Sequence, residues 1–160
     1  EIEVTRENTY SDEFPELNPQ LWEYLVEDQR YWFAKTVVAM VMVDEHIEIH
    51  ERAFLHSALR LLTSQERVQE LEEAILLGKI PPITPIRLSE EDSKNILESL
   101  INVATIDRDF DKREEKLFQQ IGNALDVDDK FIQSTIKLGH TRIQQFRANQ
   151  LRAPNVRARV

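Results

Sequence analysis

The chain has 160 residues, of which 41% are hydrophobic, enough to bury a core as a single domain. It contains no cysteine, which excludes disulfides, thiolate metal sites and thiol redox chemistry. The net charge of −9 is unevenly distributed: residues 130–160 carry seven Lys and Arg and no acid, so the 29 acids and 13 remaining bases of residues 1–129 leave a balance of −16. Such an acidic body repels nucleic acid and attracts cations or basic partners.

The first part of the chain, residues 1–17, is acidic and polar, and we expect it to form a flexible arm. Its alternating acids do not resemble a signal peptide. The longest apolar run, Val37 to Val43, is far shorter than the roughly 18 residues that span a membrane. Together with the missing cysteines, these features predict a cytoplasmic protein without a membrane span.

Apolar residues at spacings of three and four predict helices in the first half of the chain. Asn18-Pro19 is a good helix start, and it leads into one long helix, or two helices with a bend near Gln29. A further helix is expected from Glu48 to Leu62. The next one starts at Ser64 and stops at Gly78.

The second half begins after a segment that cannot be helical. Ile80–Ile86 contains three prolines, so we expect it to be extended and to join two halves of the domain. Ser89, followed by three acids, opens a helix that runs to about Ile106. Another helix is expected from Asp111 to Leu125.

A last helix is expected from Asp128 until Arg152-Ala-Pro-Asn closes it. No alternating strand pattern occurs, so we predict an all-α fold, a compact bundle of about six to eight helices. The helical domain would span residues 18–150, and residues 151–160 would form a basic tail.

Two acidic stretches repeat one frame 63 positions apart. Asp44–Glu51 and Asp107–Glu114, the two acidic boxes, each begin with Asp, place an apolar residue fourth and end with Glu. The apolar residues on both sides of the boxes keep the same register. Residues 33–63 and 96–126 therefore read as two copies of a helix-loop-helix unit.

The boxes and the apolar residues before them resemble the tellurite-resistance TerB-like domain family. The resemblance rests on Val38–Glu51 and Val103–Glu114 and covers roughly residues 30–127. It implies a compact all-helical domain whose halves each carry a pattern close to Ala-Asp-Gly-x-apolar-x-x-x-Glu, with acidic residues proposed to bind metal. Glu45 and Arg108 stand where that pattern has glycine.

The boxes have two interpretations. Asp111 with Glu114 forms a capping box, so helix capping and a solvated acidic face explain part of the pattern. Capping does not explain Asp44 and Asp107, which are expected at the ends of helices, where negative charge is unfavourable. A pseudo-twofold arrangement of the halves would gather the carboxylates at one end of the bundle, as calcium or magnesium requires. The strongest candidate ligands are Asp44, Glu51, Asp107 and Glu114, and the weaker ones are Glu48, Asp111, Asp109, His46 and His50.

Other metals and motifs fit less well. The two histidines of the first box are four positions apart but do not form His-Glu-x-x-His, so zinc is less expected than calcium or magnesium. The second box imitates the start of an EF-hand, but Lys112 and Phe118 stand where that loop has Gly and Glu. A divalent cation is therefore the expected ligand, and no organic cofactor is expected.

The chain has three glycines and no compact nucleophile-base constellation, so we expect a non-enzymatic protein. The first hypothesis is a cation-binding or scaffolding domain in a tellurite-resistance or stress-response assembly, as the resemblance implies. The alternative is a pure protein-interaction domain whose acidic face docks a basic partner without a physiological metal. Both hypotheses predict a protein partner and no nucleic acid, and a homodimer would follow if the basic tail pairs with another copy.

Overall fold

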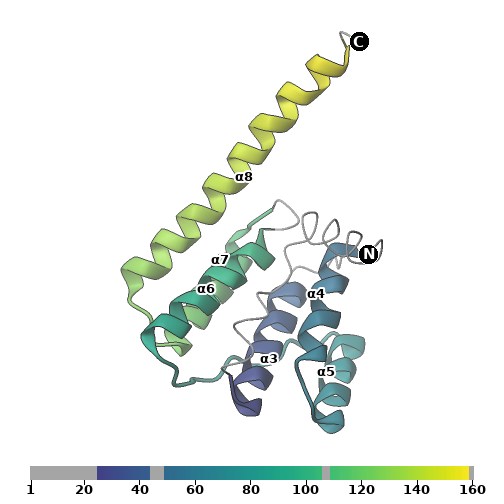
Figure 1. Ribbon diagram of the computed structural model, residues 1–160, viewed down its shortest axis with the longest axis vertical. Coiled ribbons are helices and arrows are strands. Elements are labelled where there is room, and N and C mark those ends of the chain that lie inside the picture. The colour runs from purple at the N-terminus through teal and green to yellow at the C-terminus, as the bar shows by residue number, and fades with distance from the viewer. Residues whose placement is uncertain (1–24, 44–48, 106–108, 159–160) are drawn as a thin grey trace, which may run out of the picture.

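The computed structural model describes residues 25–43, 49–105 and 109–158, with the backbone alone at 49–51, 53–54 and 152–158. Within these ranges the chain contains helices and no strand, which confirms the predicted all-α fold (Figure 1). The arm at 1–17 and the helix start at Asn18-Pro19 lie outside the described residues. The six helices in the described ranges are α3 (Glu27–Val43), α4 (Ile49–Arg60), α5 (Gln65–Leu77), α6 (Glu90–Ala104), α7 (Lys112–Ala124) and α8 (Asp129–Ala158).

Helix α3 lies at the centre of the bundle and packs against α4, α5, α6 and α7. From Trp32 to Val41 every residue except Lys35 is buried. Because neighbours surround this helix, apolar residues cover most of its circumference instead of one stripe. The core around it includes Phe118 and Ile121 of α7, both without exposed surface.

Three predicted helix starts are confirmed as N-caps. The side chains of Ser64, Ser89 and Asp111 each accept a hydrogen bond from the backbone N–H three residues further on, over 3.4, 3.1 and 2.9 Å. All three residues have extended backbone conformations, as N-caps require. The starts of α5, α6 and α7 are thus determined by local chemistry.

Helices α5 and α7 end in the same way. Gly78 follows α5 with a φ of 68°, and the backbone N–H groups of Gly78 and Lys79 donate to carbonyls in the last turn of the helix. After α7, Asp126 adopts a φ of 56°, and Val127 donates to the carbonyl of Gly122. Both ends are Schellman motifs, with glycine at one and an aspartate that tolerates the left-handed region at the other.

Residues 79–89 contain no helix, as the three prolines of this segment predict. Two hydrogen bonds hold it on the bundle. The indole Nε1 of Trp32 donates to the carbonyl of Thr84 over 2.7 Å, and the N–H of Ile86 donates to the carbonyl of Ala124 over 3.1 Å. The segment therefore contacts both the start of α3 and the end of α7.

The predicted end of the last helix is wrong. Helix α8 does not close at Arg152-Ala-Pro-Asn but runs on to Ala158. Pro154 removes one backbone hydrogen bond to the carbonyl of Gln150, and because Gln150 is exposed, water can satisfy that carbonyl. Although α8 has 30 residues, no helix in the described ranges is both long and apolar enough to cross a membrane.

Candidate interaction surface

The structure describes the side chains of three of the predicted metal ligands, Asp109, Asp111 and Glu114. His50 and Glu51 lie in the first turn of α4, where the backbone alone is described. The remaining candidates lie outside the described residues: Asp44, His46, Glu48 and Asp107. Among the described side chains, no group of three or more His, Asp and Glu could share an ion.

In the described part of the second acidic box, Asp111 is the N-cap of α7. The Asp111 carboxylate accepts the hydrogen bond from the N–H of Glu114, and this bond lowers the pKa of Asp111, with a smaller contribution from the Arg113 side chain 3.4 Å away. Glu114 is 3% exposed, whereas Asp109 is exposed. The capping interpretation is confirmed for Asp111, and the cation site stays a prediction.

In the sequence, the first acidic box joins α3 to α4 and the second joins α6 to α7. The helix ends next to the two boxes lie on the same side of the bundle. Contacts of Thr63 with Glu27, and of the 79–89 segment with α3 and α7, place the start of α3 and the ends of α4 and α7 together. The other ends, where α3 and α6 finish and α4 and α7 begin, therefore lie at the opposite side, the upper one in Figure 1.

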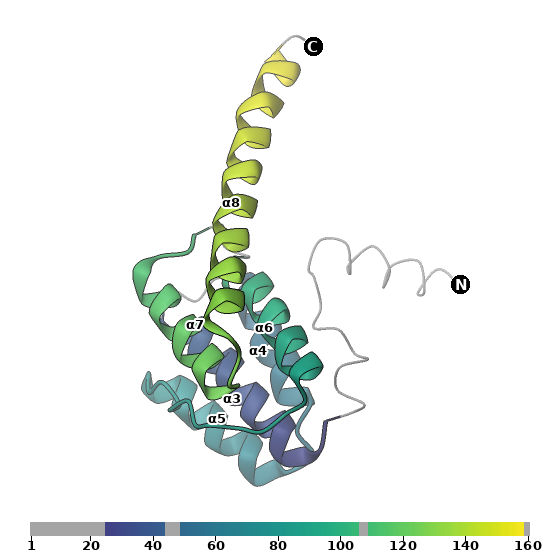
Figure 2. The same cartoon turned by 90° about the vertical axis from the view of Figure 1, so that its left-hand side faces the viewer.

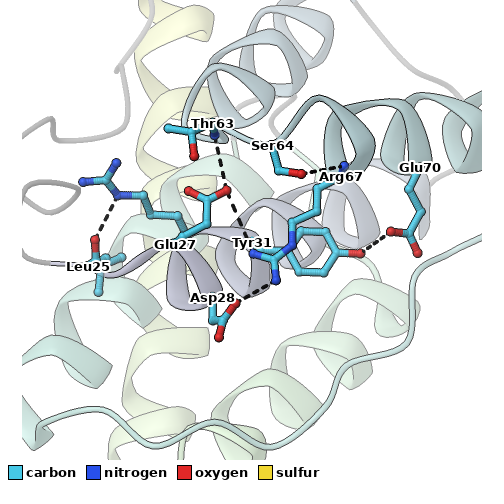
Figure 3. A network of polar contacts seen from close by, with 9 residues as sticks. Leu25, Glu27, Asp28, Tyr31, Thr63, Ser64, Arg67 and Glu70 are labelled. Atoms are coloured by element: carbon cyan, nitrogen blue, oxygen red, sulfur yellow. Dashed lines mark hydrogen bonds and ion pairs between the residues drawn. The ribbon is translucent and has the colours of Figure 1, made fainter.

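A network of polar contacts fastens the first half of α5 to the start of α3 (Figure 3). The guanidinium of Arg67 lies over the ring of Tyr31, 4.5 Å from its centroid, and donates to Asp28 over 2.7 Å. The Tyr31 hydroxyl donates to Glu70 over 2.8 Å. Burial raises the pKa of Tyr31, and the contact with the Glu70 carboxylate acts in the same direction.

The second half of α5 is arranged differently. Both α4 and α5 pack against α3, but a groove of about 450 Å³ remains between them. Leu76 at its edge is 85% exposed, and the neighbouring Leu77 is 60% exposed. The residues that line this α4–α5 groove are Arg52, Leu55, His56, Leu59, Glu72, Ile75 and Leu76. Its centre is thus mainly apolar and its edges are charged.

The exposed surface of α5 beside the groove is acidic. Four glutamates of α5 are exposed, and one of them, Glu70, takes part in the network with α3 together with the one base of the helix, Arg67. The exposed acids are Glu66, Glu70, Glu72 and Glu73. Sequence reasoning missed this surface, although the run Ile75-Leu76-Leu77 signals it, because three consecutive apolar residues cannot all face one core.

The buried residues of α8 all lie in its first half, within the part of the helix whose side chains the structure describes. Its buried residues end at Ile143, and from Gln144 to Leu151 no residue is buried. Figures 1 and 2 both show the later turns of α8 rising away from the other helices. We call residues 144–158 the distal half of α8.

Contacts with α6 and α7 hold the first half of α8. His140 contacts the carboxylate of Glu115, and its ring lies 5.2 Å from that of Phe110, centroid to centroid. Arg142 donates to the side chain of Asn102 in α6. These contacts and the buried residues all precede Gln144.

Comparison with models of protein families, with curated proteins and with solved structures finds no match for this chain. The TerB-like resemblance therefore stays a prediction from the two acidic boxes. The function has to be argued from the surfaces themselves, beginning with the α4–α5 groove, where Leu76 is 85% exposed.

Proposed function

We propose that this protein is a non-enzymatic protein-interaction domain that binds a basic amphipathic helix in the α4–α5 groove. The observation that carries the proposal is the groove itself, with apolar residues from two helices at its centre, Leu76 85% exposed at its edge, and acids beside it. An exposed apolar surface bordered by polar residues is typical of a protein-binding site.

The shape of the groove favours a helix as the bound element. Two helices that both pack on α3 and leave a groove between them offer a third helix ridges on either side. Leu55 and Leu59 are four residues apart on α4, so their side chains lie one above the other along the groove. A helix with apolar residues at spacings of three and four would match them.

The charge on the α5 side of the groove favours a basic helix, and Arg52 is the one Lys or Arg in the described lining, on the α4 side. Glu72 lines the groove, and Glu73 is exposed on the next position of α5. Residues 1–129 carry a balance of −16 in the sequence, so the whole body adds to the attraction. Opposite charge around an apolar centre speeds association and selects against acidic partners.

This proposal takes up the second of the two hypotheses from the sequence, in which an acidic face docks a basic partner. It needs no metal and uses residues outside both acidic boxes. A divalent cation at the boxes and a role in stress response stay separate predictions.

The proposal can be tested with a fluorescently labelled peptide of leucine and lysine that forms a basic amphipathic helix. Anisotropy titration should show saturable binding, and a scrambled peptide of the same composition should bind less. Leu76→Lys removes an apolar group from the groove and adds a repelling charge, so the dissociation constant should rise about tenfold or more. Leu77→Lys makes the same change next to the groove and should have little effect.

Equal binding of the ordered and scrambled peptides would mean that charge alone attracts them and would contradict the proposal. So would equal losses in Leu76→Lys and Leu77→Lys. Circular dichroism should show the same helix content in both variants, because both leucines are largely exposed.

A further inference from the structure

We infer that the helix bound in the α4–α5 groove carries acids on the flank that faces α4 and bases on the flank that faces α5. The flanks are the rows of side chains on either side of the apolar stripe of that helix. This inference rests on the proposed function, since it specifies the charges of the helix that the groove takes. It is carried by the opposite charges of the two helices that form the groove.

Every charged or titratable side chain that the structure describes on α4 is basic. These residues are Arg52, His56 and Arg60, and all three are exposed. Arg52 and His56 line the groove four positions apart, so they lie on the same side of α4, one turn from each other. The α4 wall of the groove therefore presents an arginine and a histidine beside Leu55 and Leu59.

The α5 wall of the groove has the opposite charge. Glu72 lines the groove one turn before Leu76, and the adjacent Glu73 is exposed. The one base of α5, Arg67, pairs with Asp28 of α3 over 2.7 Å and is not part of the described lining. A basic wall and an acidic wall thus lie on opposite sides of one apolar centre.

The two walls do not neutralise each other within the described part of the chain. No ion pair joins Arg52 to Glu72 among the described side chains, and both residues are exposed. A helix between the walls would therefore meet a positive charge on one flank and a negative charge on the other. Lysines on both flanks would bring like charges together at Arg52, which opposes binding. Acids on one flank and bases on the other make a favourable contact with each wall.

The distal half of α8 does not offer these two flanks. It contains Arg147, Arg152 and Arg157, and no acid follows Asp129 in the sequence. The basic C-terminal segment of a second copy is therefore not the helix that we infer.

Three helical peptides of equal length with the same leucine stripe test the inference. The segregated peptide has glutamates on one flank and lysines on the other, and the alternating peptide has the same residues mixed on both flanks. The third is the leucine-lysine peptide. Because the first two have the same composition and net charge, only the arrangement of charges differs. In anisotropy titrations of the wild type, the segregated peptide should bind about fivefold tighter than the alternating one, as expected for one exposed ion pair.

Charge reversal at Arg52 tests which wall the acids contact. Both walls are acidic in Arg52→Glu, so the segregated peptide should lose its advantage, and the leucine-lysine peptide should bind tighter than it binds the wild type. Arg60→Glu makes the same change on α4 outside the described lining, so the advantage should remain. High salt should reduce the advantage in the wild type, because it screens ion pairs. Circular dichroism should show the same helix content in both variants, since both arginines are exposed.

Equal binding of the segregated and alternating peptides to the wild type would overturn the inference. So would an advantage that persists in Arg52→Glu, or one that Arg60→Glu removes to the same extent. If the leucine-lysine peptide still binds in a manner that Leu76→Lys weakens, only the inferred charges of the partner are wrong, and the groove is still a docking site. If no peptide binds in that manner, the proposed function fails together with the inference.

Discussion

The side chain of Ile132 at the start of α8 lies directly against the backbone of Gly122 in α7. A Cβ atom on Gly122 would be 2.5 Å from Cδ1 and 2.6 Å from Cγ1 of Ile132, closer than carbon atoms of neighbouring side chains approach. Glycine inside a helix costs about 0.5–1 kcal/mol relative to alanine, so this position trades helix propensity for close packing. The contact brings the start of α8 close to the backbone of α7.

We predict that Gly122→Ala destabilises the fold by about 1–3 kcal/mol, because the overpacking exceeds the gain in helix propensity. Urea denaturation measures the change. In an Ile132→Ala background the clash is absent, so the same substitution should be neutral or stabilising. An equal cost in both backgrounds would mean that the Gly122–Ile132 contact is not the cause.

Asp111→Ala should destabilise the protein by about 1 kcal/mol, because it removes the N-cap of α7. Asp111→Asn keeps an acceptor for the N–H of Glu114 and should cost much less. For a protein of this size, 1 kcal/mol corresponds to a fall in Tm of about 2–4 °C. If both substitutions lower the free energy of unfolding by the same amount, the Asp111 side chain acts through its charge and not as a cap.

The lowered pKa of Asp111 also predicts a pH dependence. Its carboxylate is more acidic in the folded chain than the usual 3.8, so its ionised form stabilises the fold above that value. This contribution is lost as the pH falls through the lower pKa of the folded state. The stability difference between wild type and Asp111→Asn, measured by denaturation at several pH values, should therefore be constant near neutrality and narrow in acid.

Tyr31 should ionise above pH 10.0, because burial and the hydrogen bond to Glu70 favour its neutral hydroxyl. The neutral form thus stabilises the fold below pH 10.0, and this stabilisation is lost as the pH rises through the higher pKa of the folded state. The difference in tyrosinate absorbance between wild type and Tyr31→Phe isolates this group. Glu70→Gln should lower the pKa of Tyr31 part of the way towards 10.0. Titration of Tyr31 at or below pH 10.0 in the wild type would contradict the prediction.

The acidic boxes predict binding of a divalent cation, with calcium or magnesium favoured over zinc. Metal-stripped protein should show saturable heats in calorimetric titration, and an ion at a hundred times its Kd should stabilise the fold by about 2.7 kcal/mol. The double variant Asp44→Asn/Asp107→Asn should lose both effects, whereas Glu98→Gln, an exposed acid of α6, should lose neither. Equal binding by wild type and the double variant would leave the boxes as helix caps and a solvated face.

Local signals made much of the fold predictable. Ser64, Ser89 and Asp111 were identified as helix starts and Gly78 as a helix end, because each satisfies backbone groups within a few residues of itself. The end of α8 was predicted wrongly, since the rule that proline stops a helix assumes that the lost hydrogen bond cannot be replaced. Of the candidate ligands, the structure confirms a capping role for Asp111.

By itself, the sequence determined the all-α class, the order of the described helices and the division between an acidic body and a basic C-terminal segment. Each of these depends on residue type and on spacings within one helix or turn. Only the tertiary structure decided that α4 and α5 leave a groove at Leu76 and that α8 parts from the bundle after Ile143. Both outcomes depend on which surfaces of helices far apart in the sequence pack together. The spacing of apolar residues along one helix is the same whether another helix covers them or not, so the sequence pattern does not distinguish the two cases.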